Sequence, residues 1–471
     1  MEQSPSSVKP LDIQDVLIGV FLVTVTALVI LAEWTGGAVW QGFAAIGFML
    51  FVVAATPKAG WSGIAFAVAG FALFIWALIT RSDWLAITEH ALSSAAFIAA
   101  FFTALTWLRN ASASSTAINV CGRFLAEQPP GRRYATLTVG SHLFSIILNY
   151  GSIALLGNLA EASARREPNE EIRGHRIRRM LLAIQRGFVS TLPWSPLTFS
   201  VAISTSLVPG ASWADAVGYC VVSALILAGL GWALDAIFKP RLSVPSSPRP
   251  KPNGTWDSLL PLLALLAILV LSVGALQLAT GIRAVGVVMV VVPIISASWI
   301  ALQNFGDRPI ARTLSQATQY LVRDLPGYRS ELLLLTMAGF IGTLGAKLVA
   351  PLFAASGYDL TVIPGWLILV ALVWLIPITG QIGMNPILSV SLIAPLLPKA
   401  TEIGVTPAAI TTALTAGWAL SGASSPFAAT NLLVGNIARV RASHVGIVWN
   451  GAYTVLSALV LSAWVAFIAS L

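Results

Sequence analysis

Long apolar runs recur along the whole chain, and short polar segments separate them. Four such runs open the sequence, at residues 16–31, 39–55, 64–79 and 91–108. Further runs follow at residues 213–238, 259–279, 284–302, 332–353 and 445–468. Most are close to the length that a helix needs to cross about 30 Å of hydrocarbon. The pattern predicts an all-α polytopic membrane protein with about ten to twelve transmembrane segments.

Two polar interruptions break the otherwise apolar stretch 379–436. The first, Thr-Gly-Gln-Ile-Gly-Met-Asn-Pro at 379–386, lies between apolar runs 366–377 and 387–397, each too short to cross a bilayer. We expect a re-entrant hairpin there. The second interruption, at 421–431, falls inside the next long run, and we expect an unwound helix. Because non-helical backbone persists at membrane depth only where protein or water satisfies its polar groups, these elements predict a polar binding site.

The first half of the chain carries a weaker version of this pattern. A polar run at 109–116 follows the fourth apolar run, and a later run from Tyr134 contains Asn149-Tyr-Gly-Ser152. The apolar run that contains the expected break ends in Leu-Leu-Gly-Asn at Asn158 in the first half, and in Leu-Val-Gly-Asn at Asn436 in the second half. We interpret this as an internal repeat, with 110–116 as the first hairpin tip and Asn149 to Ser152 as the first helix break.

A proline-rich basic linker divides the two predicted repeats. Residues 239–253 hold five prolines and four basic residues without an acidic one, which is typical of a semi-rigid solvated segment. We therefore divide the chain into a first repeat at 1–238, a linker at 239–257 and a second repeat at 258–471. The run 181–207 is interrupted at 191–196 and fits either a kinked span or another re-entrant element.

Composition and charge agree with a membrane protein. Of 471 residues, 57% are apolar and only 10% charged, whereas soluble domains have roughly 25% charged residues. The net charge of +8 does not indicate nucleic-acid binding, because 14 of the 27 Lys and Arg residues fall in three connecting segments, 162–180, 239–253 and 304–330. This is the positive-inside pattern of a multi-pass protein of the cytoplasmic (inner) membrane. We expect the first two segments to be cytoplasmic.

The sequence carries no recognisable pattern of an enzyme. Cys121 and Cys220 lack ligand spacing, no histidine pair has helical spacing, and no phosphate-binding loop occurs. Gly60-Trp-Ser-Gly63 resembles a serine hydrolase motif, but we expect it to lie in a short loop. We expect no enzymatic activity, no organic cofactor and no resident catalytic metal.

The hairpin, the broken helix and the ending Thr-Asn-Leu-Leu-Val-Gly-Asn at 430–436 together resemble the ion transporter superfamily of secondary carriers, best known from the divalent anion/sodium symporters. Members have two repeats, each with Ser-Asn-Thr at a hairpin tip and a proline-containing break in the next helix. Here the tips contain Ser114-Ser-Thr116 and Met384-Asn-Pro386 instead. The resemblance implies substrate and ion ligands at Asn110, Ser112, Ser114, Ser115, Thr116, Asn149, Ser152, Thr379, Gln381, Asn385, Ser424, Ser425, Thr430 and Asn431.

A sodium ion suits these residue types, because it takes hard oxygen ligands from side chains and from carbonyls freed by unwinding. Asn385, Thr430 and Asn431 are the candidate sodium ligands. The alternative is that Ser, Thr and Asn only cap and pack membrane helices.

Isolated ionisable residues inside apolar runs are further candidates. Lys347 lies within the run 332–353 and Arg109 at the expected first tip, and a cation at that depth needs a partner or a cavity. Either could bind an anionic substrate, although Arg109 could equally extend to the interface. His142 could carry a proton or could be a packed neutral histidine.

These features favour a secondary active transporter that moves a small organic anion of carboxylate type, coupled to sodium, by alternating access. A proton-coupled carrier and a sodium/proton antiporter of the same superfamily stay open, and a channel or a polytopic enzyme fits less well. The expected partners are the small anionic substrate and the lipid bilayer, with no nucleic acid. The oligomeric state, a homodimer included, and the side from which each hairpin enters stay open.

Overall fold

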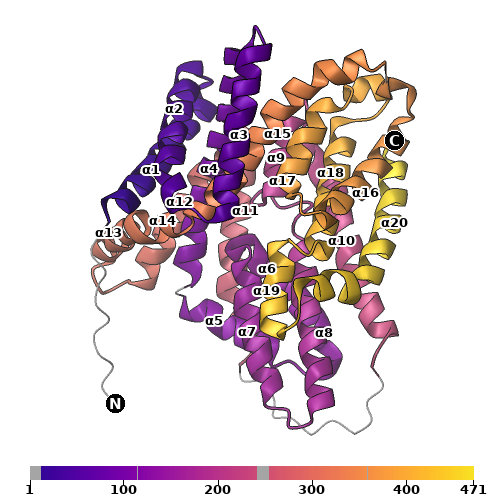
Figure 1. The fold of residues 1–471 in the computed structure, drawn as a ribbon. Helices are drawn as coiled ribbons and strands as arrows, with labels where there is room; N and C mark the ends of the chain where they lie inside the picture. The colour runs from indigo at the N-terminus through magenta and orange to yellow at the C-terminus, as the bar shows by residue number, and fades with distance from the viewer. Residues whose placement is uncertain (1–11, 114, 241–253, 358) are drawn as a thin grey trace. The chain divides into compact units, whose positions relative to one another are not determined.

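The computed structural model describes residues 12–113, 115–240, 254–357 and 359–471, and within them the regular structure is entirely helical (Figure 1). The chain forms two compact units. Unit 1 comprises Met1–Trp107 and Ser296–Leu344, and unit 2 comprises Leu108–Ile295 and Gly345–Leu471. The compact units therefore do not coincide with the two sequence halves. Most of the predicted linker, residues 241–253, lies outside the described residues.

Nine helical segments among the described residues are long and apolar enough to cross a membrane: Ile13–Thr35, Ala38–Lys58, Trp61–Thr80, Trp84–Ser112, Trp213–Ile237, Trp256–Thr280, Ala284–Gln303, Arg329–Phe353 and Gly451–Ile468. The polytopic α-helical class is thus confirmed, and the nine candidate spans compare with roughly ten to twelve expected from the sequence. The difference arises where apolar sequence is divided between shorter helices, as in Gly365–Gln381 and Pro386–Leu396.

Unit 1 consists of helices whose ends are marked in the sequence. It contains α1 (Ile13–Thr35), α2 (Ala38–Ala55), the short η1 (Thr56–Lys58), α3 (Trp61–Thr80) and most of α4 (Trp84–Ala113). It also contains α13 (Pro309–Gln319), η3 (Tyr320–Asp324), α14 (Leu325–Gly327) and the first part of α15 (Arg329–Ala355). The first helix ends at Thr35 because Gly36 adopts φ 66° and donates its N–H to the Ala32 carbonyl.

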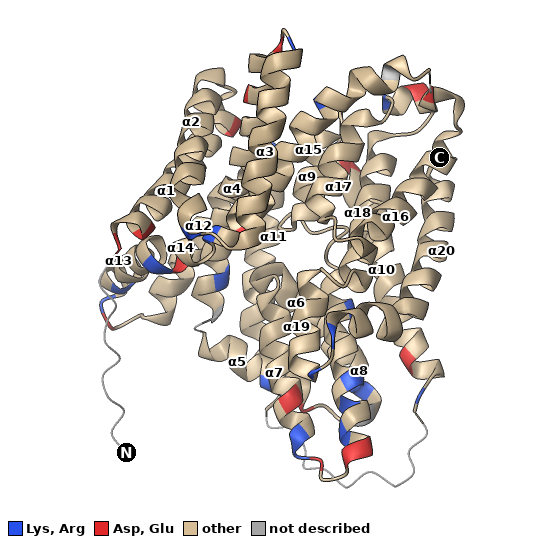
Figure 2. Ribbon diagram, viewed as in Figure 1, with Lys and Arg blue, Asp and Glu red and all other residues tan. Residues whose placement is uncertain are grey.

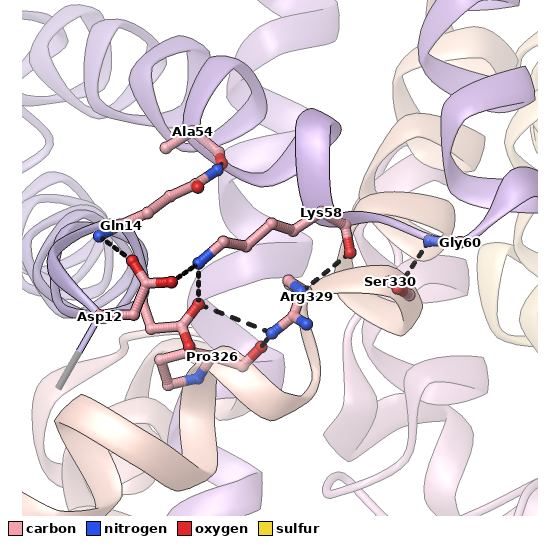
Figure 3. Close-up of polar contacts among 9 residues, drawn as sticks. Asp12, Gln14, Ala54, Lys58, Gly60, Pro326, Arg329 and Ser330 are labelled. Atoms are coloured by element: carbon pink, nitrogen blue, oxygen red, sulfur yellow. Dashed lines mark hydrogen bonds and ion pairs between the residues drawn. The ribbon is translucent and has the colours of Figure 1, made fainter. Parts of the chain in front are cut away.

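A polar cluster ties three parts of unit 1 together (Figure 3). The Lys58 ammonium bonds to Asp12 and lies 3.1 Å from Asp15, and Arg329 Nη1 lies 3.7 Å from the same Asp15 carboxylate. The Lys58 hydrogen bond lowers the pKa of the Asp12 carboxyl, which stands before the first helix. In addition, the Gly60 N–H donates to Ser330 Oγ at 2.9 Å. Since two acids face two bases, this cluster joins helix ends and leaves no excess charge for a ligand.

Unit 2 opens with six helices in the described part of the chain. These are α5 (Thr116–Ala126), α6 (Pro130–Leu148), α7 (Gly151–Arg165), α8 (Glu170–Val189), α9 (Phe199–Leu207) and α10 (Trp213–Ile237). The two-residue turn Asn149-Tyr150 joins α6 to α7, and both helices pack on α8. Asn149 has φ 49°, a left-handed conformation that asparagine tolerates better than most residues.

The later part of unit 2 is also built from paired and interrupted helices. After η2 (Trp256–Leu259), α11 (Leu260–Thr280), most of α12 (Ala284–Gln303) and the end of α15 come α16 (Gly365–Gln381) and α17 (Pro386–Ile393). They are followed by α18 (Pro407–Ser424), α19 (Ala429–Ala438), the π-helical turn η7 (His444–Trp449) and α20 (Gly451–Ile468). Helix α16 packs on α18, and α10, α18 and α20 pack on one another.

The first-half expectations need correction. The polar run 110–116 is the end of α4 and the start of α5, and the tightly turned helix pair of that half is α6 with α7. Asn149 and Ser152, expected at a helix break, lie instead at the turn and in the first residues of α7. The break falls at 190–198, between α8 and α9, so the run 181–207 is an interrupted helix. Both α6 and α7 pack against α8, which local polarity does not reveal.

Candidate functional site

Two interrupted helices form the centre of unit 2, and a Ser-Pro pair lies in each interruption. Helix α8 ends at Val189 and α9 begins at Phe199, with Ser195-Pro196 between them; α18 ends at Ser424 and α19 begins at Ala429, with Ser425-Pro426 between them. Proline has no N–H and disfavours helical backbone in the residue before it. Each Ser-Pro pair therefore disfavours helical backbone within its break, and in both cases the second helix begins four residues after the serine.

The two breaks are closed by the same hydrogen bond. Ser200 Oγ donates to the Leu192 carbonyl, and Thr430 Oγ1 donates to the Gly422 carbonyl. In each case the acceptor lies three residues before the serine of Ser-Pro, and the donor lies five residues after it. A hydroxyl of the second helix thus satisfies a carbonyl that unwinding frees in the first.

Each interrupted helix also meets its neighbour at a glycine in the same position, eight residues before that serine. A Cβ on Gly187 of α8 would lie 2.3 Å from the Thr138 carbonyl oxygen of α6. A Cβ on Gly417 of α18 would lie 2.7 Å from the Leu372 carbonyl oxygen of α16. The pairs α6–α8 and α16–α18 therefore approach closely enough that only glycine fits.

In the first pair, His142 of α6 connects to the break after α8. Trp194 Nε1 donates to His142 Nε2 at 3.2 Å, so Nε2 is an acceptor and Nδ1 carries the proton. That Nδ1–H donates to Ser190 Oγ at 2.7 Å, and the Ser190 hydroxyl donates to the Gly187 carbonyl at 2.7 Å. The ring is therefore a neutral histidine with both nitrogens bonded.

In the second pair, the end of α16 connects to the break after α18. Ser425 Oγ donates to the Gly380 carbonyl at 2.6 Å, and Gln381 Nε2 donates to Ser424 Oγ at 3.1 Å. A Cβ on Gly380 would lie 2.4 Å from Ser421 Oγ, a buried hydroxyl without a hydrogen-bond partner. These contacts bring four predicted site residues of the second half, Gln381, Ser424, Ser425 and Asn431, to the same break; Asn431 joins through a bond to the Ser425 carbonyl.

A directed chain of buried amides links the two breaks. Asn431 Nδ2 donates to the carbonyls of Ala423 and Ser425 at 3.2 and 2.8 Å, so its Oδ1 faces away from the break. Gln185 Nε2 donates to that Oδ1 at 2.7 Å, and Asn450 Nδ2 donates to Gln185 Oε1 at 3.0 Å. All three amides are fully buried. Their orientation follows from the carbonyls at one end of the chain and from a guanidinium at the other.

That guanidinium belongs to Arg186, whose Nε donates to Asn450 Oδ1 at 3.1 Å. Gln185, Arg186 and Asn450 were absent from the sequence-based candidates. Arg186 could have been noticed, because it interrupts an apolar run in the same way as Lys347. Its partners could not, since Arg186 and Asn450 are 264 residues apart.

The other candidates occupy varied positions in unit 2. Thr379 Oγ1 bonds with Ser389 Oγ at 3.0 Å, and Asn385 caps α17 by accepting from the Ile387 N–H at 2.9 Å. Ser152 Oγ bonds with Ser145 Oγ at 2.8 Å beside the α6–α7 turn. These contacts stabilise local helix ends. The side-chain oxygen of Asn385 can still accept a further hydrogen bond.

The first-half polar run is only partly buried. Asn110 and Ser112 belong to α4, buried Ser115 precedes α5, and Thr116 is its exposed first residue. Ser114 lies outside the described residues. Lys347 is exposed on α15, whereas Arg109 Nε lies 3.4 Å from the position of a Cβ on Gly151, beside the α6–α7 turn.

Charge is scarce around the breaks. No Lys, Arg, Asp or Glu occurs in α16 to α19 apart from the short connection before α18, while charged residues gather around the connection of α7 to α8 (Figure 2). Within the described residues, no group of three or more His, Cys, Asp or Glu side chains is placed to hold a metal ion. The polar atoms at the breaks are hydroxyls, amides and main-chain carbonyls.

No protein-family model and no curated protein matches the chain. Among solved structures, the YdaH transporter of Alcanivorax borkumensis matches with a TM-score of 0.55 and 15% identity, over 87% of this chain and 98% of that one. MtrF of Neisseria gonorrhoeae, described with a class of antimetabolite efflux pumps, matches with a TM-score of 0.56 and 13% identity, over 88% and 97%. At such identities the likeness concerns the fold: this chain has the multi-pass membrane fold of these two bacterial transporters.

Proposed function

We propose that the chain is a secondary active carrier that works by alternating access. The observation that carries the proposal is the matched pair of helix breaks, each with a Ser-Pro pair, a hydroxyl-to-carbonyl bond across eight residues and a close glycine contact. Broken helices at a shared centre are how secondary carriers build a site from two repeats. The fold likeness to two transporters supports the same function.

The repeats in this proposal are α6 to α10 and α16 to α20. Each supplies a helix pair, an interrupted helix and a following helix, in that order. We assign the two pairs, α6 with α7 and α16 with α17, as the re-entrant hairpins expected from the sequence, with the first moved from 110–116 to the Asn149 turn. The amide chain from Asn431 through Gln185 to Asn450 joins the repeats, so a change at one break alters the bonds available at the other.

We propose a small organic anion as the substrate and sodium as the coupling ion. His142 supports sodium over protons, because a second proton on its ring would displace the Trp194 donor from Nε2. The candidate sodium ligands differ in availability. Asn385 Oδ1 accepts one N–H and has a free lone pair, whereas Asn431 Oδ1 already accepts from Gln185. Ion binding at Asn431 would therefore have to weaken its hydrogen bond with Gln185. This would couple ion binding to a conformational change at the breaks.

Transport into proteoliposomes tests the function. The purified chain should accumulate at least one labelled carboxylate from a panel of mono- and dicarboxylates, and an inward sodium gradient should increase the initial rate several-fold. Because MtrF is described with efflux pumps, vesicles preloaded with the same panel should be assayed for export. Saturable flux that no ion gradient drives would contradict secondary active transport, and unsaturable current would indicate a channel.

Lys347→Met is a test of the sequence-based anion candidate. If Lys347 binds the substrate, the apparent KM should rise by about tenfold, because a charge-assisted contact contributes about 1.5 kcal/mol or more. Initial-rate measurements at saturating sodium report this change, with expression and thermal stability equal to wild type. The alternative is that Lys347, which is exposed on α15, only faces solvent or lipid. In that case the apparent KM of the variant would equal that of wild type.

A further inference from the structure

Arg186 is a buried cation in the centre of unit 2. It is 5% exposed and lies on α8, four residues before the C-cap residue Ser190. Its side chain contacts three other helices. Its Nη1 donates to the Tyr134 hydroxyl of α6 at 3.0 Å and to the Gly231 carbonyl of α10 at 3.3 Å. The guanidinium carbon lies 4.4 Å from the centre of the Tyr453 ring of α20. These contacts fix the plane of the guanidinium.

Every one of these contacts is to an uncharged group. Within the described residues, no carboxylate forms an ion pair with Arg186, and the nearby acids are already engaged. Asp235 pairs with Arg179 at 2.7 Å, and Glu167 pairs with Arg176 at 2.8 Å. A buried guanidinium without a counter-charge is costly. The positive charge of Arg186 therefore has no partner in the described chain.

One nitrogen of the group is still available. Nε is occupied by Asn450 and Nη1 by Tyr134 and Gly231, whereas Nη2 has no acceptor among the described residues. Nη2 is also absent from the polar atoms that are both sealed from solvent and unpartnered. Its two N–H groups are therefore not committed to a described acceptor, and the Tyr453 ring lies against the face of the guanidinium.

We propose that Arg186 is the anion-binding residue of this protein, and that its Nη2 receives a carboxylate of the transported solute. The proposal rests on the carrier function and gives it a substrate class. Tyr134, Asn450 and Tyr453 act as positioning residues, because they hold the guanidinium through Nη1, Nε and its face and leave Nη2 unengaged. A carboxylate supplies the missing counter-charge and two acceptors, and arginine binds such planar oxyanions more directionally than lysine.

The same geometry connects anion binding to the break in the second repeat. Arg186 Nε holds Asn450, which orients Gln185, which in turn bonds to Asn431. An anion that draws the guanidinium toward itself weakens the first of these bonds. The amide chain then transmits occupancy of the site from α8 to α19, so both repeats respond to one substrate.

The test is direct binding to the purified full chain in detergent, independent of transport. Thermal unfolding would be followed with benzoate and succinate as carboxylate probes, and with benzamide and succinamide as neutral counterparts, at constant ionic strength. Wild type should be stabilised by at least one acid and by neither amide. Arg186→Met should lose this stabilisation, with an apparent Kd at least about tenfold higher. Arg165→Met, which removes an exposed arginine paired with Glu161, is the matched control and should bind like wild type.

Arg186→Lys distinguishes a role of Arg186 in carboxylate binding from a purely structural role. It keeps the charge but lacks the planar fork, so it should retain carboxylate binding at reduced affinity even if Arg186→Met fails to fold. Equal carboxylate affinity in wild type and a folded Arg186 variant would overturn the proposal, as would wild type that distinguishes no acid from its amide. If wild type binds a carboxylate through Arg186 but transports none, the carrier function fails and the site stands. If transport occurs without dependence on Arg186, only the site fails.

Discussion

Alanine at Gly187 or at Gly417 is expected to lower the free energy of unfolding by about 1–3 kcal/mol and to reduce transport to a small fraction of wild type. The added Cβ would lie 2.3 Å from the Thr138 carbonyl oxygen in the first case and 2.7 Å from the Leu372 carbonyl oxygen in the second. Both obstacles are main-chain atoms, which cannot rotate away as a flexible side chain can. The helices must separate instead, which displaces each break from its helix pair.

Two other glycines of unit 2 provide the control. Gly218 and Gly229 of α10 have no atom within 4 Å of an added Cβ, so alanine there should be neutral or stabilising by up to about 1 kcal/mol. Thermal unfolding in detergent and initial transport rates would be compared across all four variants. If Gly187→Ala and Gly417→Ala behaved like these controls, the close helix contacts, and with them the proposed repeat, would lose their support.

The sequence predicted the second half of the site more accurately than the first. The turn expected at 379–386 lies between α16 and α17, and the break expected at 421–431 lies between α18 and α19. Both were predictable because glycine, proline and asparagine determine backbone conformation locally. The same reasoning noticed the interruption at 191–196 but left its structure open.

The first helix pair of the proposed repeat differs from the one predicted from the sequence, and the difference has a physical reason. The run 110–116 is more polar than the true turn at Asn149-Tyr150, but it lies between α4 and α5. What distinguishes the true pair is packing on α8, which depends on residues such as Gly187 and Thr138 that carry no polar signal. Local composition indicates that a helix ends and does not indicate which helix it will pack against.

The buried network was beyond the reach of a single sequence for a related reason. Gln185 and Asn431 are 246 residues apart in the sequence, and Asn450 and Gln185 are 265 residues apart. Each is an ordinary polar residue near the end of an apolar run. Only the fold shows that the three amides are hydrogen-bonded to one another. It also shows that Arg186 lies at the end of this hydrogen-bonded series, with no carboxylate paired to it among the described residues.

Asn431→Ala is expected to destabilise the protein by about 3 kcal/mol or more and to abolish transport. The side chain donates to the carbonyls of Ala423 and Ser425 and accepts from Gln185, and it is fully buried. Its removal leaves freed carbonyls of the break and the Gln185 amide without partners, and each buried unsatisfied group costs about 1–3 kcal/mol. Chemical or thermal unfolding in detergent measures the loss, and uptake into proteoliposomes measures the activity.

Asn385→Ala is the matched comparison, because it removes the same type of side chain at the second asparagine among the candidate sodium ligands. Asn385 is half-buried and only caps α17, so its loss should cost about 1 kcal/mol and leave the fold intact. If its free lone pair binds sodium, the variant should need several-fold more sodium for half-maximal transport, while substrate affinity at saturating sodium stays near wild type. An Asn431→Ala protein as stable as Asn385→Ala would show that the break does not depend on the amide chain. Unchanged sodium activation in Asn385→Ala would remove the α16–α17 turn from the proposed ion site and leave Thr430, Asn431 and the carbonyls of the breaks as the candidate ligands.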